Sequence, residues 1–378
     1  MSNKRKLLVG ADLGGTSMMA AVVDITTGTV LGEDKRRTRR ELGAAAVTER
    51  LATCIKRAIA QAKVKPKDVC GVGVGIPGPV DPVQGRVARC VNLGPSWDNY
   101  LLQESLERLI NLPVTIDNDV NVGAVGEHRF GAGRDAKDIV VMFVGTGIGG
   151  GLVLDGKLHT GFRYSAGEVG HMVLVDEQTG PLCGCGERGH AEALASRSAI
   201  ERRILQARAA MAEEAPSADE PLGDDQGDEA TPSPANQGEA DVQITSGEIL
   251  AALEAGDPVV QEAVASAQYY LGLMVANCMN VIDPEVIVIG GGVIEKMGAG
   301  YLEPVRSVAH RHCVNKDDLD RVRIVPAALG DYSGVIGAAV LASQRLCSGS
   351  GCWPAHASDR EAVAGPPTPL DGWPAPLK

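Results

Sequence analysis

Short apolar runs separated by glycine-rich turns predict many of the strands in this chain. Residues 6–36 follow the plan strand, Gly-rich turn, strand, tight turn, strand, and residues 138–161 repeat it with a Gly/Thr turn after their first apolar run. Apolar runs bounded by Gly, Asp and Thr are typical of strands. Because the two copies lie about one domain apart, the repeat predicts two related halves and not a solenoid.

Helical periodicity fills the segments around these strands. Apolar residues recur at helical spacing in residues 44–63, 100–110, 121–130 and 257–282. Further apolar runs are short enough to be buried strands, and they lie in residues 68–81, 112–120 and 284–295. An alternation of strands and helices predicts an α/β fold.

Two segments differ in composition from the rest. Residues 209–241 are rich in Asp, Glu, Pro, Ser, Gly and Ala and nearly lack large apolar side chains, and residues 346–378 are rich in Pro. Such segments cannot bury enough apolar surface to offset the entropy of ordering the chain. We therefore expect a disordered acidic insertion at 209–241 and a disordered tail at 346–378.

Size and charge narrow the class of partner. With 378 residues, 44% of them hydrophobic, the chain can bury the cores of two domains. A net charge of −12 disfavours nucleic acid and anionic membranes, since a negative protein gains nothing from counterion release. The absence of a signal sequence and of a long uncharged apolar run favours a cytoplasmic protein that binds a small molecule. Nine cysteines then indicate reduced thiols or a metal site.

Glycine-rich turns after predicted strands are candidate phosphate sites. Their residues are Asp12, Gly14, Gly15 and Thr16; Gly145, Thr146 and Gly147; and Gly290, Gly291 and Gly292. Such turns let the backbone approach a phosphate closely, and a carboxylate at the strand end can hold a cation. Taken singly, each turn fits an ordinary hairpin or a tight strand-to-helix connection equally well. Two such loops that face one another across a cleft would clamp a nucleotide triphosphate.

The stretch "IDNDVN" offers polar groups at the end of an apolar strand. Asp117, Asn118 and Asp119 follow "PVTI" directly, so the strand would present them to a cleft. A carboxylate there can accept the proton of an attacking hydroxyl, and the neighbouring amide can hold a second hydroxyl. The alternative is a helix N-cap ahead of residues 121–130. We expect capping to account for one of the three residues.

The stretch "CGCGERGHAE" has the composition of a metal site. Cys183, Cys185 and His190 lie close in sequence, and His171 lies upstream in "GEVGH". These four side chains are of the types that Zn²⁺ prefers, and closed four-ligand coordination is typical of a structural site. The alternative is a hydrogen-bonded histidine beside small packed cysteines.

Taken together, these motifs resemble the ROK family of sugar kinases and sugar-responsive repressors, and most of all its bacterial glucokinase branch. The resemblance covers residues 7–341 apart from the insertion and is carried by "DLGGT", "GIPGPVD", "NDVN", "GTGIGGG", "GEVGH", "CGCGERGHAE" and "IGGG". It implies an actin-like, hexokinase-like fold of two ribonuclease-H-type lobes, at 1–120 and 121–345, with the active-site cleft between them. It also implies a homodimer or homotetramer.

The resemblance also implies a role for each matching residue. Asp119 would be the general base that takes the proton of the sugar 6-hydroxyl. Other sugar contacts would come from Gly78, Asn118, Glu168, His171 and Glu192. Asp12 would help to position Mg²⁺. The first two glycine turns would surround the phosphates, and the third would lie near the adenosine.

One position departs from the family pattern. The pattern Cys-x-Cys-Gly-x-x-Gly-Cys-x-Glu has a third cysteine where this chain has His190. We expect zinc to bind still, through His171, Cys183, Cys185 and His190, with His171 in contact with both zinc and sugar. The rival interpretation is a zinc-free loop in which His190 bonds a carbonyl. The departure also weakens the alignment of Glu192.

The sequence thus predicts an ATP- and Mg²⁺-dependent kinase that phosphorylates the 6-hydroxyl of glucose or a close relative. The alternatives are a sugar-sensing regulator and a catalytically inactive sugar-binding protein of the same family. Repressors of the family carry a helix-turn-helix domain ahead of the first phosphate loop, and we expect none here because few residues precede that loop. The expected partners are a hexose and ATP.

Overall fold

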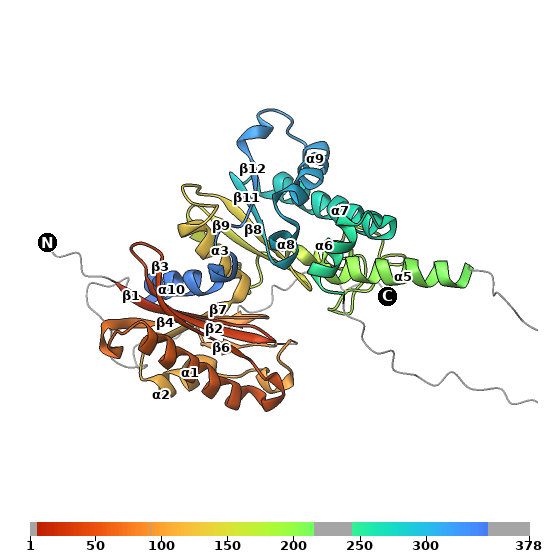
Figure 1. The fold of residues 1–378 in the computed structure, drawn as a ribbon. Coiled ribbons are helices and arrows are strands. Elements are labelled where there is room, and N and C mark those ends of the chain that lie inside the picture. The colour runs from red at the N-terminus through yellow and green to blue at the C-terminus, as the bar shows by residue number, and fades with distance from the viewer. Residues whose placement is uncertain (1–5, 91, 215–243, 347–378) are drawn as a thin grey trace, which may run out of the picture.

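Two five-stranded sheets form the framework of the protein (Figure 1). The computed structural model describes residues 6–90, 92–214 and 244–346. The first sheet has the strand order β3-β2-β1-β4-β7, and the second has the order β10-β9-β8-β11-β12. Within the described residues, no helix is long and apolar enough to span a membrane.

The first sheet uses chain segments from the start of the sequence. Its strands are β1 (Leu7–Leu13), β2 (Ser17–Asp24), β3 (Thr29–Arg37), β4 (Val69–Ile76) and β7 (Val114–Asn118). β1, β2 and β3 pair antiparallel, whereas β1, β4 and β7 pair parallel. The helices α1 (Gly43–Gln61) and α2 (Leu102–Ile110) lie on one face of this sheet (Figure 1). The short strands β5 (Val80–Asp81) and β6 (Arg86–Val87) form a separate hairpin after β4.

The second sheet repeats the first in order and direction. Its strands are β8 (Ile139–Val144), β9 (Ile148–Leu154), β10 (Lys157–Leu158), β11 (Val286–Gly290) and β12 (Arg323–Pro326). β8, β9 and β10 pair antiparallel, and β8, β11 and β12 pair parallel. The prediction of two related halves is therefore confirmed.

Most helices of the second half lie on the face of its sheet that is turned away from α3 and the first sheet (Figure 1). They are α4 (Ala191–Ala195), α5 (Arg197–Glu214), α6 (Ser246–Glu254), α7 (Pro258–Ile282), α8 (Gly292–Met297) and α9 (Leu302–His312). Residues Val140 and Met142 of β8 face this helical layer, whereas Ile139 and Val141 belong to a different core on the opposite face. This alternation is what a strand with two buried faces requires.

Two helices fill the space between the sheets. They are α3 (Asp119–Phe130) and α10 (Ser333–Leu346), which pack on each other, with α10 against β1 and β4 and α3 against β8 and β9 (Figure 1). Glycines make this close approach possible. A Cβ built on Gly10 would lie 1.6 Å from the Val335 carbonyl oxygen, and one on Gly337 would lie 1.6 Å from the Val122 carbonyl oxygen. The helix that begins at Asp119 is therefore held from both sides.

The prediction places the start of the disordered insertion too early in the sequence. α5 continues as a regular helix to Glu214, so the prediction of disorder from residue 209 is wrong for residues 209–214. Its residues there include Ala209, Ala210, Met211 and Ala212, which favour helix. The rest of the insertion and residues 347–378 of the tail lie outside the described residues, while Leu346 ends α10.

Candidate active site and metal centre

The predicted sugar-site residues meet at one cavity of about 800 Å³. It lies where the ends of β4 and β7 face the turn between β8 and β9. The predicted residues that line it are Gly78, Asn118, Asp119, Gly145, Gly147, Glu168, His171, Cys185, Glu192 and Gly291. The remaining predicted residues are not part of its lining, and they are Asp12, Gly14, Gly15, Thr16, Thr146, Cys183, His190, Gly290 and Gly292.

Asn118 connects the start of α3 to the loop at Gly78, and both line the cavity. Its Oδ1 accepts hydrogen bonds from the backbone N–H groups of Val120 and Asn121, at 2.9 and 3.2 Å, so it is the N-cap of α3. Its Nδ2 donates to the Gly78 carbonyl at 3.1 Å. Gly78 has φ 95°, and a Cβ there would lie 2.4 Å from the Arg89 carbonyl oxygen, which explains the glycine. The expectation that capping accounts for one residue of "DND" is confirmed.

Asp119, the first residue of α3, has a shifted acidity. Burial raises the pKa of its carboxyl to about 6, and the charge of Glu168 adds to the rise. The backbone N–H of Val120 donates to Asp119 Oδ1 at 3.0 Å and opposes the shift. A carboxylate of this kind has the basicity that proton abstraction near neutral pH requires.

Asp12, at the end of β1, lies in the same electrostatic environment as Asp119. Burial raises the pKa of Asp12 to about 7, with further contributions from the charges of Asp119 and Asp331. Lys35 is a cation that opposes this rise. Carboxylates that repel one another in a buried place are suited to hold a hard cation such as Mg²⁺.

The first glycine turn is a tight connection between β1 and β2. The N–H of Gly14 donates to the Ser17 carbonyl at 2.9 Å. The buried Thr38 closes the turn from outside, with its Oγ1 donating to the Gly14 carbonyl at 2.6 Å and its N–H to the Thr16 carbonyl at 2.8 Å. These bonds leave Thr16 exposed at the tip.

The second and third glycine turns follow β8 and β11. In the second, the N–H of Gly145 donates to the Gly147 carbonyl at 2.9 Å. In the third, Gly291 has φ 91°, and a Cβ there would lie 2.6 Å from the Val144 carbonyl oxygen. This close approach to the end of β8 brings the second and third turns together.

Glu192 joins the second glycine turn to the cysteine loop. Its Oε2 accepts a hydrogen bond from the Ile148 N–H at 2.9 Å, and the Cys183 thiol donates to its Oε1 at 3.4 Å. A Cβ on Gly147 would lie 2.2 Å from Glu192 Oε2, so only glycine leaves room for this carboxylate. The contact fixes Glu192 at the cavity wall.

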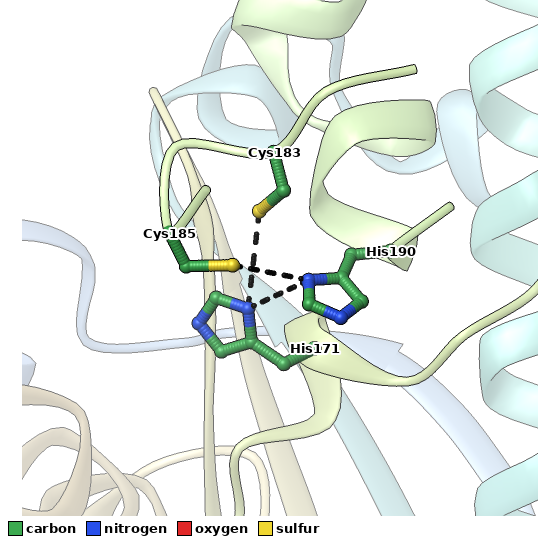
Figure 2. A group of neighbouring side chains, drawn as sticks. All are labelled: His171, Cys183, Cys185 and His190. Atoms are coloured by element: carbon green, nitrogen blue, oxygen red, sulfur yellow. Dashed lines mark hydrogen bonds between the residues drawn. The ribbon is translucent and has the colours of Figure 1, made fainter. Parts of the chain in front are cut away.

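Four predicted metal ligands converge on one point (Figure 2). The ligand atoms of His171, Cys183, Cys185 and His190 all lie within 4.8 Å of one another. The two Nδ1 atoms are 3.3 Å apart, Cys185 Sγ is 3.3 Å from His190 Nδ1, and Cys183 Sγ is 3.9 Å from His171 Nδ1. Tetrahedral Zn²⁺ with ordinary bond lengths needs about 3.3 Å between two nitrogens and about 3.6 Å between nitrogen and sulfur. The residues present therefore fit the metal.

The two ring nitrogens of His171 point to different neighbours. Nδ1 faces Cys183 and His190 (Figure 2). Nε2 lies 3.9 Å from Glu168 Oε2. Both His171 and Glu168 line the cavity. The orientation of one imidazole therefore connects the metal centre to the cavity wall.

Comparison with known proteins identifies the family. The ROK family matches residues 8–345. The chain belongs to the ROK family. A glucokinase of Halalkalibacterium halodurans is 32% identical over 337 residues, covering 89% of this chain and 95% of the relative. A xylose repressor of Caldicellulosiruptor bescii is 31% identical over 281 residues, covering 74% of this chain and 62% of that protein.

A solved ROK structure has the same architecture. The glucokinase of Streptomyces griseus, in complex with glucose and AMPPNP, is 29% identical and superposes with a TM-score of 0.70, covering 89% of this chain and 99% of that one. This ROK protein thus has the actin-like, two-lobed fold that the sequence motifs predicted.

Several cavity residues of this ROK protein were not predicted. They are Arg89, Cys90, Asn92, Phe143 and Ser165. Arg89, Cys90 and Asn92 reach the cavity because the β5–β6 hairpin folds the chain back after β4, and Ala88 N–H donates to the Pro79 carbonyl at 2.9 Å. No local pattern in the sequence signals that return.

Proposed function

We propose that this ROK protein is a kinase that transfers the γ-phosphoryl group of ATP to the 6-hydroxyl of glucose or a close relative. The observation that carries the proposal is the position of Asp119. It lines one cavity together with the second glycine turn and a polar wall made by Asn118, Glu168, His171 and Glu192. The similarity to glucokinases, one of them solved with glucose and an ATP analogue, supports the same activity.

The polar wall offers hydrogen-bonding groups for the hydroxyls of a hexose. Within the described residues, Asn118 Nδ2 donates to Gly78 alone and keeps its second hydrogen for a ligand, and Glu168 and Glu192 offer carboxylate oxygens. His171 presents Nε2 to the cavity when Nδ1 is turned to the metal centre. These contacts would orient the sugar with its 6-hydroxyl at Asp119, which accepts the proton as the phosphoryl group arrives.

The phosphate side of the cleft would hold Mg-ATP. Gly14, Gly15 and Thr16 on one lobe and Gly145–Gly147 on the other would surround the phosphates, with Gly290–Gly292 toward the adenosine. Asp12 would hold Mg²⁺, which supplies electrostatic stabilisation of the phosphates when bound. Since Asp12 repels Asp119, a cation at Asp12 would also lower the cost of ionising the general base.

A panel of sugars tests the function directly. We expect ATP-dependent ADP release with glucose or a near relative among hexoses and N-acetylhexosamines. A chain that binds a sugar tightly but turns over none would contradict the kinase and favour a sugar-responsive regulator, the second candidate, which the similarity to a xylose repressor supports.

The pH dependence of kcat/KM for the sugar tests Asp119 as the base. Burial raises the pKa of Asp119 to about 6, and only the ionised form accepts a proton. We expect kcat/KM to be flat above this pKa and to fall about tenfold per pH unit below it. Saturating Mg²⁺ keeps Asp12 ionised during the measurement. A profile flat down to pH 5 would contradict the assignment.

A further inference from the structure

We propose that Arg197, the first residue of α5, is a further phosphate ligand that binds the polyphosphate part of the nucleotide beside Thr146. The inference rests on the proposed function, because it deepens the nucleotide site. Its basis is a set of contacts that tie the Arg197 side chain and backbone to the second glycine turn. The sequence analysis did not predict Arg197 as a site residue.

Arg197 sets the direction of the Thr146 hydroxyl. Arg197 Nη2 donates a hydrogen bond to Thr146 Oγ1 at 3.2 Å. A hydroxyl that accepts from a guanidinium turns its own hydrogen elsewhere, and Thr146 is exposed at the tip of its turn. That hydrogen is therefore available to a phosphate oxygen, and the positive guanidinium lies directly behind it.

The guanidinium is held in place from the other side. Arg197 Nη1 donates to Glu201 Oε2 at 3.2 Å and to the Ile244 carbonyl at 3.0 Å. The side chains of Arg197 and Glu201 are 18% and 13% exposed. An arginine fixed by such bonds loses little further side-chain entropy when an anion arrives.

Arg197 keeps donors for a ligand. A guanidinium has five N–H groups. Within residues 6–90, 92–214 and 244–346, its bonds to Thr146, Glu201 and Ile244 use three of them. Its Nε–H and one Nη2 hydrogen have no hydrogen-bond partner there. Planar donors of this kind match the geometry of phosphate oxygens.

The backbone places the start of α5 at the same turn. The N–H of Arg197 donates to the Gly145 carbonyl at 2.9 Å. α5 runs for 18 residues, so the positive end of its dipole lies at this contact. The backbone bond thus anchors Arg197 at this turn, where the guanidinium and the helix dipole are positive and the ion pair with Glu201 offsets part of the guanidinium charge.

The cavity lining carries several negative charges, so a nucleotide needs positive groups beside it. The carboxylates Asp119, Glu168 and Glu192 line the cavity and would repel an incoming triphosphate. Arg89 is the fixed cation among the described lining residues, and it lies with the β5–β6 hairpin. Arg197 is the cation attached to the second glycine turn itself.

Nucleotide binding by Arg197 variants tests the proposal. We expect Arg197→Ala to raise the Kd for ADP and the KM for ATP about 10-fold to 100-fold, the range of a charge-assisted hydrogen bond. The Kd for adenosine and the Kd for the sugar without nucleotide should stay within twofold of wild type. Arg197→Gln replaces the guanidinium by a shorter, neutral amide, and it should weaken ADP binding as well.

Arg208→Ala is the matched control, because Arg208 lies on the same helix and pairs with Asp257 away from the turn. Unchanged ADP affinity in a folded Arg197→Ala or Arg197→Gln protein overturns the proposal. Equal losses for ADP and adenosine also overturn it, since they indicate a structural role only. The binding assay stands apart from turnover. A wild-type protein that phosphorylates no sugar, yet binds ADP through Arg197, contradicts the proposed function and leaves this inference intact.

Discussion

Asp119→Asn lowers kcat about 10³-fold with the preferred hexose, if Asp119 is the general base. A positioned base contributes about 10²-fold to 10⁴-fold to a rate, and an amide of the same shape cannot accept the proton. Asparagine keeps an Oδ1 that can accept the bond from the Val120 N–H, and Asn118 remains the N-cap of α3, so the helix should form normally. The measurement is steady-state ADP release at saturating Mg-ATP, together with the Kd for the sugar.

Asp117 offers a control of the same residue type two positions away. It is buried, pairs with Arg345 and accepts from Asn121 Nδ2 at 2.8 Å, so its contacts are structural. We expect Asp117→Asn to reduce stability and to leave the kcat of the folded protein near wild type. A residual kcat above a tenth of wild type in Asp119→Asn, with sugar binding intact, would show that another group takes the proton.

The predictions from sequence succeeded where the signal is local. The repeat of apolar runs and glycine turns predicted β1, β2, β3, β8 and β9, and further apolar runs predicted β4, β7 and β11, because each of these strands carries its own local pattern. Strand β12 was not predicted. The four metal ligands were likewise found by residue type and close spacing, and the structure brings them together.

The failures concern long-range contacts. Nothing near Gly10 or Gly337 indicates that α10 packs between the sheets, because the reason for each glycine lies in a distant segment. Arg197 is similar, since its neighbours Thr146 and Ile244 are remote in sequence. Local periodicity cannot reveal which charges tertiary folding places beside a turn.

The metal centre carries the second large expected effect. We expect the protein, purified without a His tag, to hold one Zn²⁺ per chain and to lose it in His190→Ala and Cys183→Ala. Loss of zinc should raise the KM for the hexose about 10-fold to 100-fold, because the metal fixes the His171 ring whose Nε2 faces Glu168. Zinc content by mass spectrometry and KM, with Mg²⁺ supplied in excess, are the measurements.

Two variants sharpen this test. Cys313→Ala removes a buried thiol of α9's C-terminal end that lies outside the ligand cluster, and it should keep both zinc and KM. His190→Cys restores the third cysteine of the family pattern, and it should keep zinc because a thiolate replaces an imidazole among ligands that zinc accepts equally. Zinc near zero in the wild type and one equivalent in His190→Cys would mean that the histidine abolished the site. The loop would then hold His171 by the contacts among its own side chains, such as the 3.3 Å approach of the two Nδ1 atoms.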